Sequence, residues 1–256
     1  MPIKIFLNKK NKLIDASDQF IPFATNGWWN KIIADDFDGD GKVDLIIANY
    51  GLNSPLQASE QEPVQLYASD IDGNGSIDPI MTHYNNHVAY PFFPMDDINQ
   101  QVPSLRKKFY DYEVYANATI KDIIPAEALK SIHPLMANNF KTMYLKNTGK
   151  RFVAKELPIQ AQYSPVYSIN AVDINHDGYK DVILCGNNIY NKILLGRDDA
   201  NHGLVLQNDG KGNFTYLPPA KSGLTIHGDV RSIENIGNYL FFGINNQPVK
   251  VYSINK

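Results

Sequence analysis

The sequence has a single cysteine, and this scarcity excludes an internal disulfide framework, because a disulfide within one chain needs two thiols. Cys185 ends the apolar run Val182-Ile183-Leu184-Cys185. A thiol in such a run is typical of a small buried hydrophobic residue. We therefore expect Cys185 to belong to the core and to serve neither as a nucleophile nor as a metal ligand.

Long apolar runs and a surplus of positive charge are also missing. No apolar run approaches the roughly 18 residues that a membrane span needs, and the first ten residues offer only Ile5-Phe6-Leu7, which is too short for the core of a signal peptide. The 24 Lys and Arg residues face 27 Asp and Glu residues, so no excess of cations is present to neutralise a phosphate backbone. We expect no membrane span, no export signal within this chain and no nucleic-acid partner.

Strong helix-forming runs are confined to one stretch of the chain, whereas residues that favour turns are abundant. The 256 residues include 17 Gly and 15 Pro, and 43% of them are hydrophobic, which is enough for a globular core. Short apolar segments separated by Gly, Asn and Asp are typical of strands joined by tight turns. The composition therefore predicts an all-β fold.

An acidic nine-residue loop recurs at 36–44, 70–78 and 173–181, each time between two apolar segments that we predict to be strands. Further hairpins are expected at 3–14, 143–153, 204–216 and 232–244. Two such hairpins make a four-stranded antiparallel sheet, the size of a propeller blade. We therefore predict one β-propeller domain over 1–256, partial or small, with about four blades of four strands each.

The hairpin series is interrupted between about residues 84 and 141. There, apolar residues recur at steps of three or four, which is typical of a helix with one buried face. This pattern predicts a helical insertion over 88–131, either a cap on the sheets or a lid over a ligand. The apolar positions are Leu105, Phe109, Tyr112, Ala116, Ile120 and Ile123.

Each acidic loop has the oxygen spacing of the first half of an EF-hand loop: side-chain oxygens at positions one, three, five and nine, glycine at six and a backbone carbonyl at seven. Three or four acidic groups within nine residues repel one another unless a cation lies among them. We therefore predict up to three Ca²⁺ sites. Magnesium is disfavoured, because it prefers water-rich octahedral sites. The predicted ligands are Asp36, Asp38, Asp40, Lys42 (carbonyl) and Asp44; Asp70, Asp72, Asn74, Ser76 (carbonyl) and Asp78; and Asp173, Asn175, Asp177, Tyr179 (carbonyl) and Asp181.

A competing explanation is that Asp-Gly and Asn-Gly simply make good hairpin turns. It suffices at 208–213, where the spaced carboxylates are missing. It does not explain the other three loops, because a turn needs only one Asp or Asn before glycine.

These loops resemble the calcium loops of FG-GAP (VCBS-type) repeats, the blades of integrin α-subunit propellers. The wider pattern, from Pro63-Val64-Gln65-Leu66-Tyr67 to Gln162-Tyr163-Ser164-Pro165-Val166, resembles the C-terminal part of long Bacteroidetes proteins of the ASPIC/UnbV, cartilage-acidic-protein-like type. The resemblance covers nearly the whole chain. It implies an extracellular or cell-envelope location and further propeller blades in a longer parent chain.

No catalytic constellation is evident, which favours a binding or adhesion module for a protein or glycan over an enzyme. The alternative is a calcium-dependent polysaccharide lyase or hydrolase on the same scaffold. Of the six histidines, only His83 and His87 have metal-ligand spacing, and they lie in an Asn-rich turn rather than on one helix face. The aromatic residues around Tyr90 could stack on sugar rings, although such density is more typical of a core.

Overall fold

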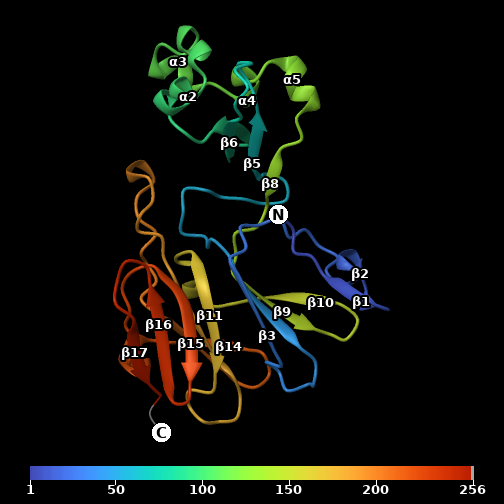
Figure 1. Ribbon diagram of the computed structural model, residues 1–256, viewed down its shortest axis with the longest axis vertical. Helices are drawn as coiled ribbons and strands as arrows, with labels where there is room; N and C mark the ends of the chain where they lie inside the picture. The colour runs from blue at the N-terminus through green and yellow to red at the C-terminus, as the bar shows by residue number, and fades with distance from the viewer. Residues whose placement is uncertain (255–256) are drawn as a thin grey trace. The chain divides into compact units, whose positions relative to one another are not determined.

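The computed structural model describes residues 1–254, and β-strands dominate it (Figure 1). Within these residues, 17 strands form five antiparallel sheets, which confirms the predicted all-β fold. The chain divides into two compact units. The smaller unit comprises Met1–Pro2, Ala24–Gly27 and Leu56–Asn139, and the larger unit comprises Ile3–Phe23, Trp28–Pro55 and Phe140–Lys256. The single domain expected over 1–256 stays a prediction.

The larger unit consists of one two-stranded hairpin and three larger sheets, ordered β10-β9-β4-β3, β11-β12-β13-β14 and β15-β16-β17. The hairpins expected around its turns are present. Its strands are β1 (Phe6–Lys9), β2 (Lys12–Asp15), β3 (Lys31–Asp35), β4 (Asp44–Ala48), β9 (Met143–Asn147), β10 (Phe152–Glu156), β11 (Val166–Val172), β12 (Asp181–Gly186), β13 (Leu204–Asn208), β14 (Phe214–Leu217), β15 (Val230–Ile236), β16 (Tyr239–Ile244) and β17 (Lys250–Ser253). Its short helices are α1 (Ser17–Phe20), η2 (Ile159–Gln162), η3 (Ile193–Leu195) and α6 (Pro219–Ser222).

The three sheets meet along strands at their edges, because β11 contacts both β3 and β15 (Figure 1). No sheet closes on itself among the residues that the structure describes.

The apolar run Val182-Ile183-Leu184-Cys185 forms most of β12 and has no alternating polar residues. Its side chains point alternately into two cores: Leu184 packs with Ile46 and Leu206, whereas Ile183 and Cys185 pack with a second cluster. Both faces of this strand are therefore buried, and Cys185 is fully inaccessible, as expected. Burial raises the pKa of its thiol to about 12.

The smaller unit contains one sheet, ordered β7-β6-β5-β8, from β5 (Val64–Ser69), β6 (Asp78–Asn85), β7 (Val88–Pro91) and β8 (Leu135–Ala137). Proline has no N–H for a ladder, so the sequence predicts that the strand containing Pro79 lies at a sheet edge. This expectation is wrong, because β6 lies between β5 and β7. Strand β7 pairs only with residues 82–85, so no strand on that side needs a donor from Pro79, whose carbonyl instead accepts from the Gln101 side chain at 3.2 Å.

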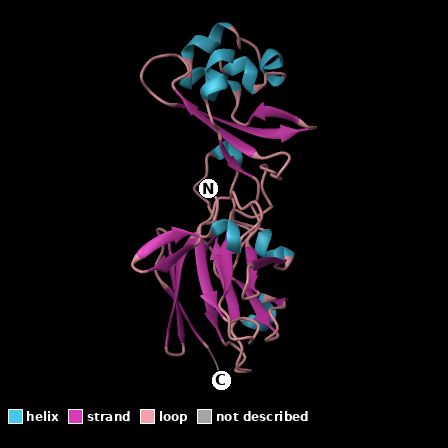
Figure 2. Cartoon of the chain, turned by 90° about the vertical axis from the view of Figure 1, so that its right-hand side faces the viewer, coloured by secondary structure: helices cyan, strands magenta, loops and turns pink. Residues whose placement is uncertain are grey.

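Short helices follow β7 and cluster in the smaller unit (Figure 2). They are α2 (Met95–Gln101), η1 (Pro103–Lys107), α3 (Tyr112–Ala116), α4 (Ile120–Ile123) and α5 (Ala126–Ser131). The apolar stripe predicted for this segment is only partly correct. Phe109, Ile120 and Ile123 are buried against Ile80 of β6, but Tyr112 and Ala116 are exposed. Residues 88–91 form a strand, and the rest breaks into helices of four to seven residues.

Candidate metal sites

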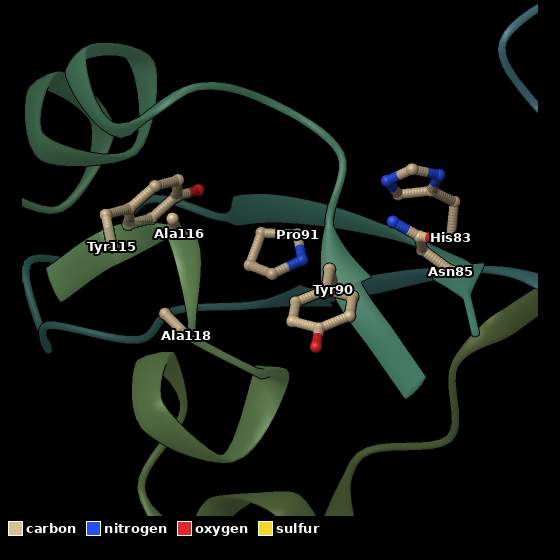
Figure 3. Close-up of a pocket in the computed structure, with 7 residues that line it drawn as sticks. All are labelled: His83, Asn85, Tyr90, Pro91, Tyr115, Ala116 and Ala118. Atoms are coloured by element: carbon tan, nitrogen blue, oxygen red, sulfur yellow. The ribbon is translucent and has the colours of Figure 1, made fainter. Parts of the chain in front are cut away.

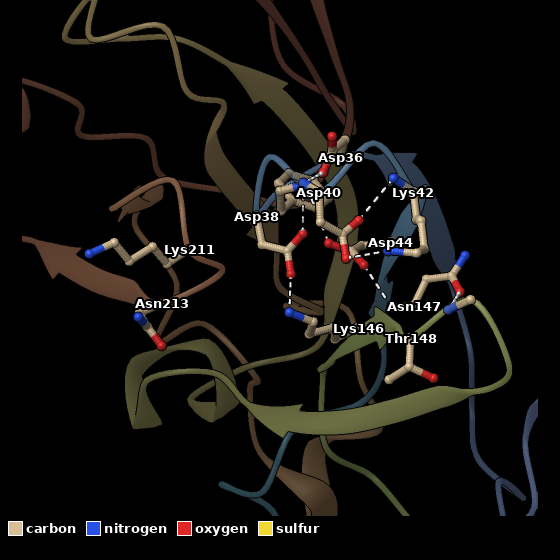
Figure 4. A network of polar contacts seen from close by, with 12 residues as sticks. Asp36, Asp38, Asp40, Lys42, Asp44, Lys146, Asn147, Thr148, Lys211 and Asn213 are labelled. Atoms are coloured by element: carbon tan, nitrogen blue, oxygen red, sulfur yellow. Dashed lines mark hydrogen bonds and ion pairs between the residues drawn. The ribbon is translucent and has the colours of Figure 1, made fainter.

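The first acidic loop, 36–44, joins β3 to β4 and curls around its own carboxylates (Figure 4). Asp36 accepts hydrogen bonds from the N–H groups of Asp40 (3.2 Å) and Gly41 (2.8 Å), and Asp40 accepts from the N–H of Lys42 (2.9 Å). Gly41 has φ of +80°, a value that residues with a Cβ rarely adopt. As a result, carboxylate oxygens of Asp36, Asp38 and Asp40 lie within 4.8 Å of one another.

The other two acidic loops repeat this hydrogen-bond pattern. In each, the carboxylate at position one accepts from the N–H groups at positions five and six, and the side chain at position five accepts from the N–H at position seven. The carboxylate at position nine accepts from the N–H at position two, at 2.9 Å in loop 70–78 and 3.1 Å in loop 173–181. One sequence spacing thus produces one loop geometry three times.

The loops differ in which predicted ligands they bring together. In loop 70–78, oxygens of Asp70, Asp72 and Asp78 lie within 4.8 Å of one another. Loop 173–181 does not form such a group of three acidic side chains within residues 1–254. There, the Asn175 amide donates to Asp177 at 2.8 Å, so two of its predicted ligands bind each other. Two acidic clusters could therefore hold a metal ion. The remaining predicted side-chain ligands, Asp44, Asn74, Asp173 and Asp181, lie in the same loops, as do the predicted carbonyl donors Lys42, Ser76 and Tyr179.

The carboxylate at position nine is buried in all three loops, with exposed fractions of 0% for Asp44, 3% for Asp78 and 1% for Asp181. Burial is the main cause that raises the pKa values of Asp44 and Asp181 above the ordinary range. A buried carboxylate is costly unless hydrogen bonds or a cation compensate its charge. The position-nine carboxylates therefore depend on their hydrogen bonds or on a nearby cation.

Neighbouring strands brace two of these carboxylates, and sequence reasoning missed the braces. Asp44 accepts from the Tyr144 hydroxyl and from the N–H of Asn147, both at 2.7 Å. Asp181 accepts from the N–H of Asn208 at 2.9 Å. Both asparagines also donate their amide to the carbonyl at position eight of the loop, at 3.0 Å for Asn147 and 3.1 Å for Asn208.

A signal for these braces exists in the sequence. Leu145-Lys146-Asn147-Thr148-Gly149 and Leu206-Gln207-Asn208-Asp209-Gly210 share the pattern Leu-x-Asn-x-Gly. In each case the pattern ends a strand that pairs with the strand directly after an acidic loop, β9 with β4 and β13 with β12. The pattern could have indicated that each turn packs against its loop.

Two lysines approach the first loop (Figure 4). The Lys42 ammonium pairs with Asp40 at 2.8 Å, and the Lys146 ammonium of β9 pairs with Asp38. The hydrogen bond from the Lys42 ammonium lowers the pKa of Asp40. The hydrogen bond that Lys146 donates to Asp38 raises the pKa of Lys146. No lysine or arginine pairs with Asp70, Asp72 or Asp78 among the ion pairs of the described residues. The first loop is therefore partly neutralised by the protein, and the second is not.

The histidines do not gather into a transition-metal site of three or more ligands within the described residues. His83 packs edge-on against Phe92, with ring centroids 5.3 Å apart, whereas Nδ1 of His87 lies 2.5 Å from a Glu62 carboxylate oxygen. His83 and His87, the two histidines with metal-ligand spacing in the sequence, thus lie in different environments. His202 and His227, far apart in sequence, have ring centroids 4.7 Å apart, a pairing that the sequence did not reveal.

The chain matches no known family, curated protein or solved structure in comparisons with all three. Among the described residues, no helix is both long and apolar enough to cross a membrane.

Proposed function

We propose that this chain is a calcium-stabilised binding or adhesion module that recognises a protein or a glycan. The observation that carries the proposal is the convergence of three carboxylates in loop 36–44 and three in loop 70–78. Both loops are curled by the same hydrogen bonds from their own backbone, which hold the acidic groups close together. Such gathering costs electrostatic energy that a bound cation recovers.

Calcium fits these loops better than magnesium does. The candidate ligands are carboxylate and carbonyl oxygens from one flexible loop, which suit the six to eight oxygen ligands of Ca²⁺. Loop 173–181 offers three carboxylates and one amide and completes the proposed set of up to three sites. Its Asn175–Asp177 hydrogen bond uses the amide nitrogen of Asn175 and leaves the amide oxygen available as a ligand.

The same proposal includes the propeller and the family. Three antiparallel sheets meet along β3, β11 and β15, as inner strands of consecutive blades would. Membership of the FG-GAP (VCBS-type) and ASPIC/UnbV-like proteins, an extracellular or cell-envelope location and additional blades in a longer parent chain are parts of this proposal. They are supported by the repeated loop geometry and by the resemblance of the motifs.

A polysaccharide lyase or hydrolase is the weaker alternative. Such an enzyme needs an acid or base poised over a substrate cleft. The cleft that the smaller unit contains is lined by His83, Asn85, Tyr90, Pro91, Tyr115, Ala116 and Ala118, with no carboxylate, lysine or arginine among them. Burial raises the pKa of Tyr115, and its hydroxyl donates to the carbonyl of Phe93, which makes it a poor base.

Thermal melts with excess chelator and with added calcium test the proposal. Calcium should raise the melting temperature by mass action, because it binds the folded loops and not the unfolded chain. Terbium luminescence should report the same sites, and Asp36→Ala and Asp70→Ala should each remove part of the signal. Asp209→Ala, in the exposed turn that lacks the spacing, is the matched control. Identical melts in chelator and calcium would refute the proposal.

A further inference from the structure

The cleft of the smaller unit has a volume of about 310 Å³ and lies beside the β6–β7 hairpin and α3 (Figure 3). His83 and Tyr90 are opposite each other in the β6–β7 ladder, and Asn85 lies two residues beyond His83. Side chains at such positions project from the same face of a hairpin. Tyr115, Ala116 and Ala118 complete the lining from α3 and the turn after it.

Three polar groups on this hairpin have unused hydrogen-bonding capacity. Within residues 1–254, the Asn85 amide, the Tyr90 hydroxyl and the His83 ring nitrogens make no hydrogen bond. Asn85 is exposed, and His83 and Tyr90 are half-buried. Together they offer both donors and acceptors from one side of the cleft.

The rest of the lining is apolar and uncharged. The ring of Pro91 lies between Tyr115 on one side and His83 on the other, with Tyr90 beside it (Figure 3). Burial lowers the pKa of His83, so its imidazole is neutral at pH 7. The lining therefore offers ring faces and neutral hydrogen-bonding groups, without a cation for a phosphate or carboxylate or a carboxylate for an amine.

We propose that this cleft binds a neutral sugar residue of a glycan, with Asn85 and Tyr90 hydrogen-bonded to its hydroxyls and the Pro91 and tyrosine rings against its apolar C–H face. This inference rests on the proposed binding function and specifies its ligand class. A sugar matches the lining because it carries several hydroxyls and one apolar face but no charge. A cleft of this volume is at the small end of the range for ligand sites, about 300 to 1,000 Å³, which suits one terminal residue rather than a long chain.

The test uses the calcium-loaded full chain on an array of immobilised neutral oligosaccharides with sialylated and sulfated counterparts, followed by calorimetric titration of the strongest neutral binder. We expect neutral oligosaccharides to bind, and we expect their sialylated and sulfated counterparts to bind no more tightly. Asn85→Ala, at an exposed position, and Tyr90→Ala should each weaken binding by about tenfold. Tyr90→Phe keeps the ring and removes the hydroxyl, so the difference between Tyr90→Phe and Tyr90→Ala measures the contribution of the ring to binding. Tyr110→Ala, a highly exposed tyrosine outside the cleft, is the matched control and should change binding less than about twofold.

The inference is overturned if no neutral glycan binds, if only anionic ones bind, or if binding is unchanged in both Asn85→Ala and Tyr90→Ala. Capture of an extended peptide at the same residues, with no glycan bound, would also overturn it. These outcomes are independent of the calcium melts. Loss of the calcium effect with intact, cleft-dependent glycan binding would refute the metal part of the proposed function alone.

Discussion

Asp44 and Asp40 belong to the same acidic loop, but their surroundings predict different roles. Asp44 is fully buried and accepts from Tyr144 and Asn147, whereas Asp40 is exposed and pairs with Lys42. Asp44→Ala leaves three donors without an acceptor, the Tyr144 hydroxyl and the N–H groups of Asn147 and Phe37, and each buried orphan costs about 1 to 3 kcal/mol. We expect Asp44→Ala to lower the free energy of unfolding by roughly 3 kcal/mol even in chelator, and Asp40→Ala to act only in calcium.

Urea denaturation with and without chelator measures both effects. Asp209→Ala removes the same charge from an exposed turn and should change stability little in either condition. Equal losses for Asp44→Ala and Asp40→Ala in chelator would show that position nine has no structural role of its own.

The position of Lys146 beside loop 36–44 affects the relative calcium affinities of loops 36–44 and 70–78. By carboxylate count, loop 36–44 should bind calcium more tightly than loop 70–78. The Lys146 ammonium beside Asp38 works against this order, because a cation must compete with it. We expect Lys146→Gln to raise terbium affinity at this loop by about three- to tenfold, and the effect to shrink at high salt.

Lys150→Gln makes the same charge change in the exposed hairpin turn that follows β9 and is the control for overall charge. An equal gain in both variants would mean that net charge, and not the Asp38 contact, sets the affinity.

At the residue scale, sequence spacing predicted the loop ligands but not their partners. The alternation of oxygen side chains with Gly41 is local information, and it specifies the curl of the loop. Tyr144, Lys146 and Asn147 belong to β9, about a hundred residues further along the chain, so only the pairing of β4 with β9 reveals them.

At the scale of elements, the spacing of apolar residues predicts that Phe109 and Tyr112 share one buried helical stripe, but only Phe109 is buried. Phe109 packs in the core of the smaller unit, with its ring edge-on to Tyr115 at 5.2 Å, whereas Tyr112 is 59% exposed. We expect Phe109→Ala to cost roughly 3 to 5 kcal/mol of stability, the range for truncating a buried aromatic side chain. Tyr112→Ala should cost less than about 1 kcal/mol. Chemical denaturation of the two variants measures the difference, and comparable losses would restore the continuous stripe.

The predicted continuous stripe is wrong because helix caps interrupt the segment, and the spacing of apolar residues does not take them into account. Asp111 caps α3 by accepting from the N–H of Glu113 at 2.6 Å, and Thr119 and Asp122 form a capping box for α4. Each cap restarts the helix at a new rotation, so positions three or four apart no longer share a face. Strand β12 was easier to predict, since an uninterrupted apolar run suits a strand whose two faces are both buried.

At the scale of the whole molecule, the acidic loops are divided between the two units. Loops 36–44 and 173–181 belong to the larger unit, and loop 70–78 belongs to the smaller. We therefore expect Asp36→Ala to destabilise the larger unit in limiting calcium and Asp70→Ala to destabilise the smaller. To distinguish these two effects, a measurement must report the opening of one unit alone. The thiol of Cys185 in the larger unit provides such a measurement.

Because the only thiol of the chain is buried in β12, disulfide-exchange reagents can react with it only when the larger unit opens. When closing is faster than labelling, the reaction rate reports the population of the open form, and a tenfold faster rate corresponds to about 1.4 kcal/mol. In limiting calcium, Asp36→Ala should accelerate labelling about tenfold and Asp70→Ala should leave it unchanged. Cys185 thus makes the native chain its own reporter of sub-global opening, with no engineered label.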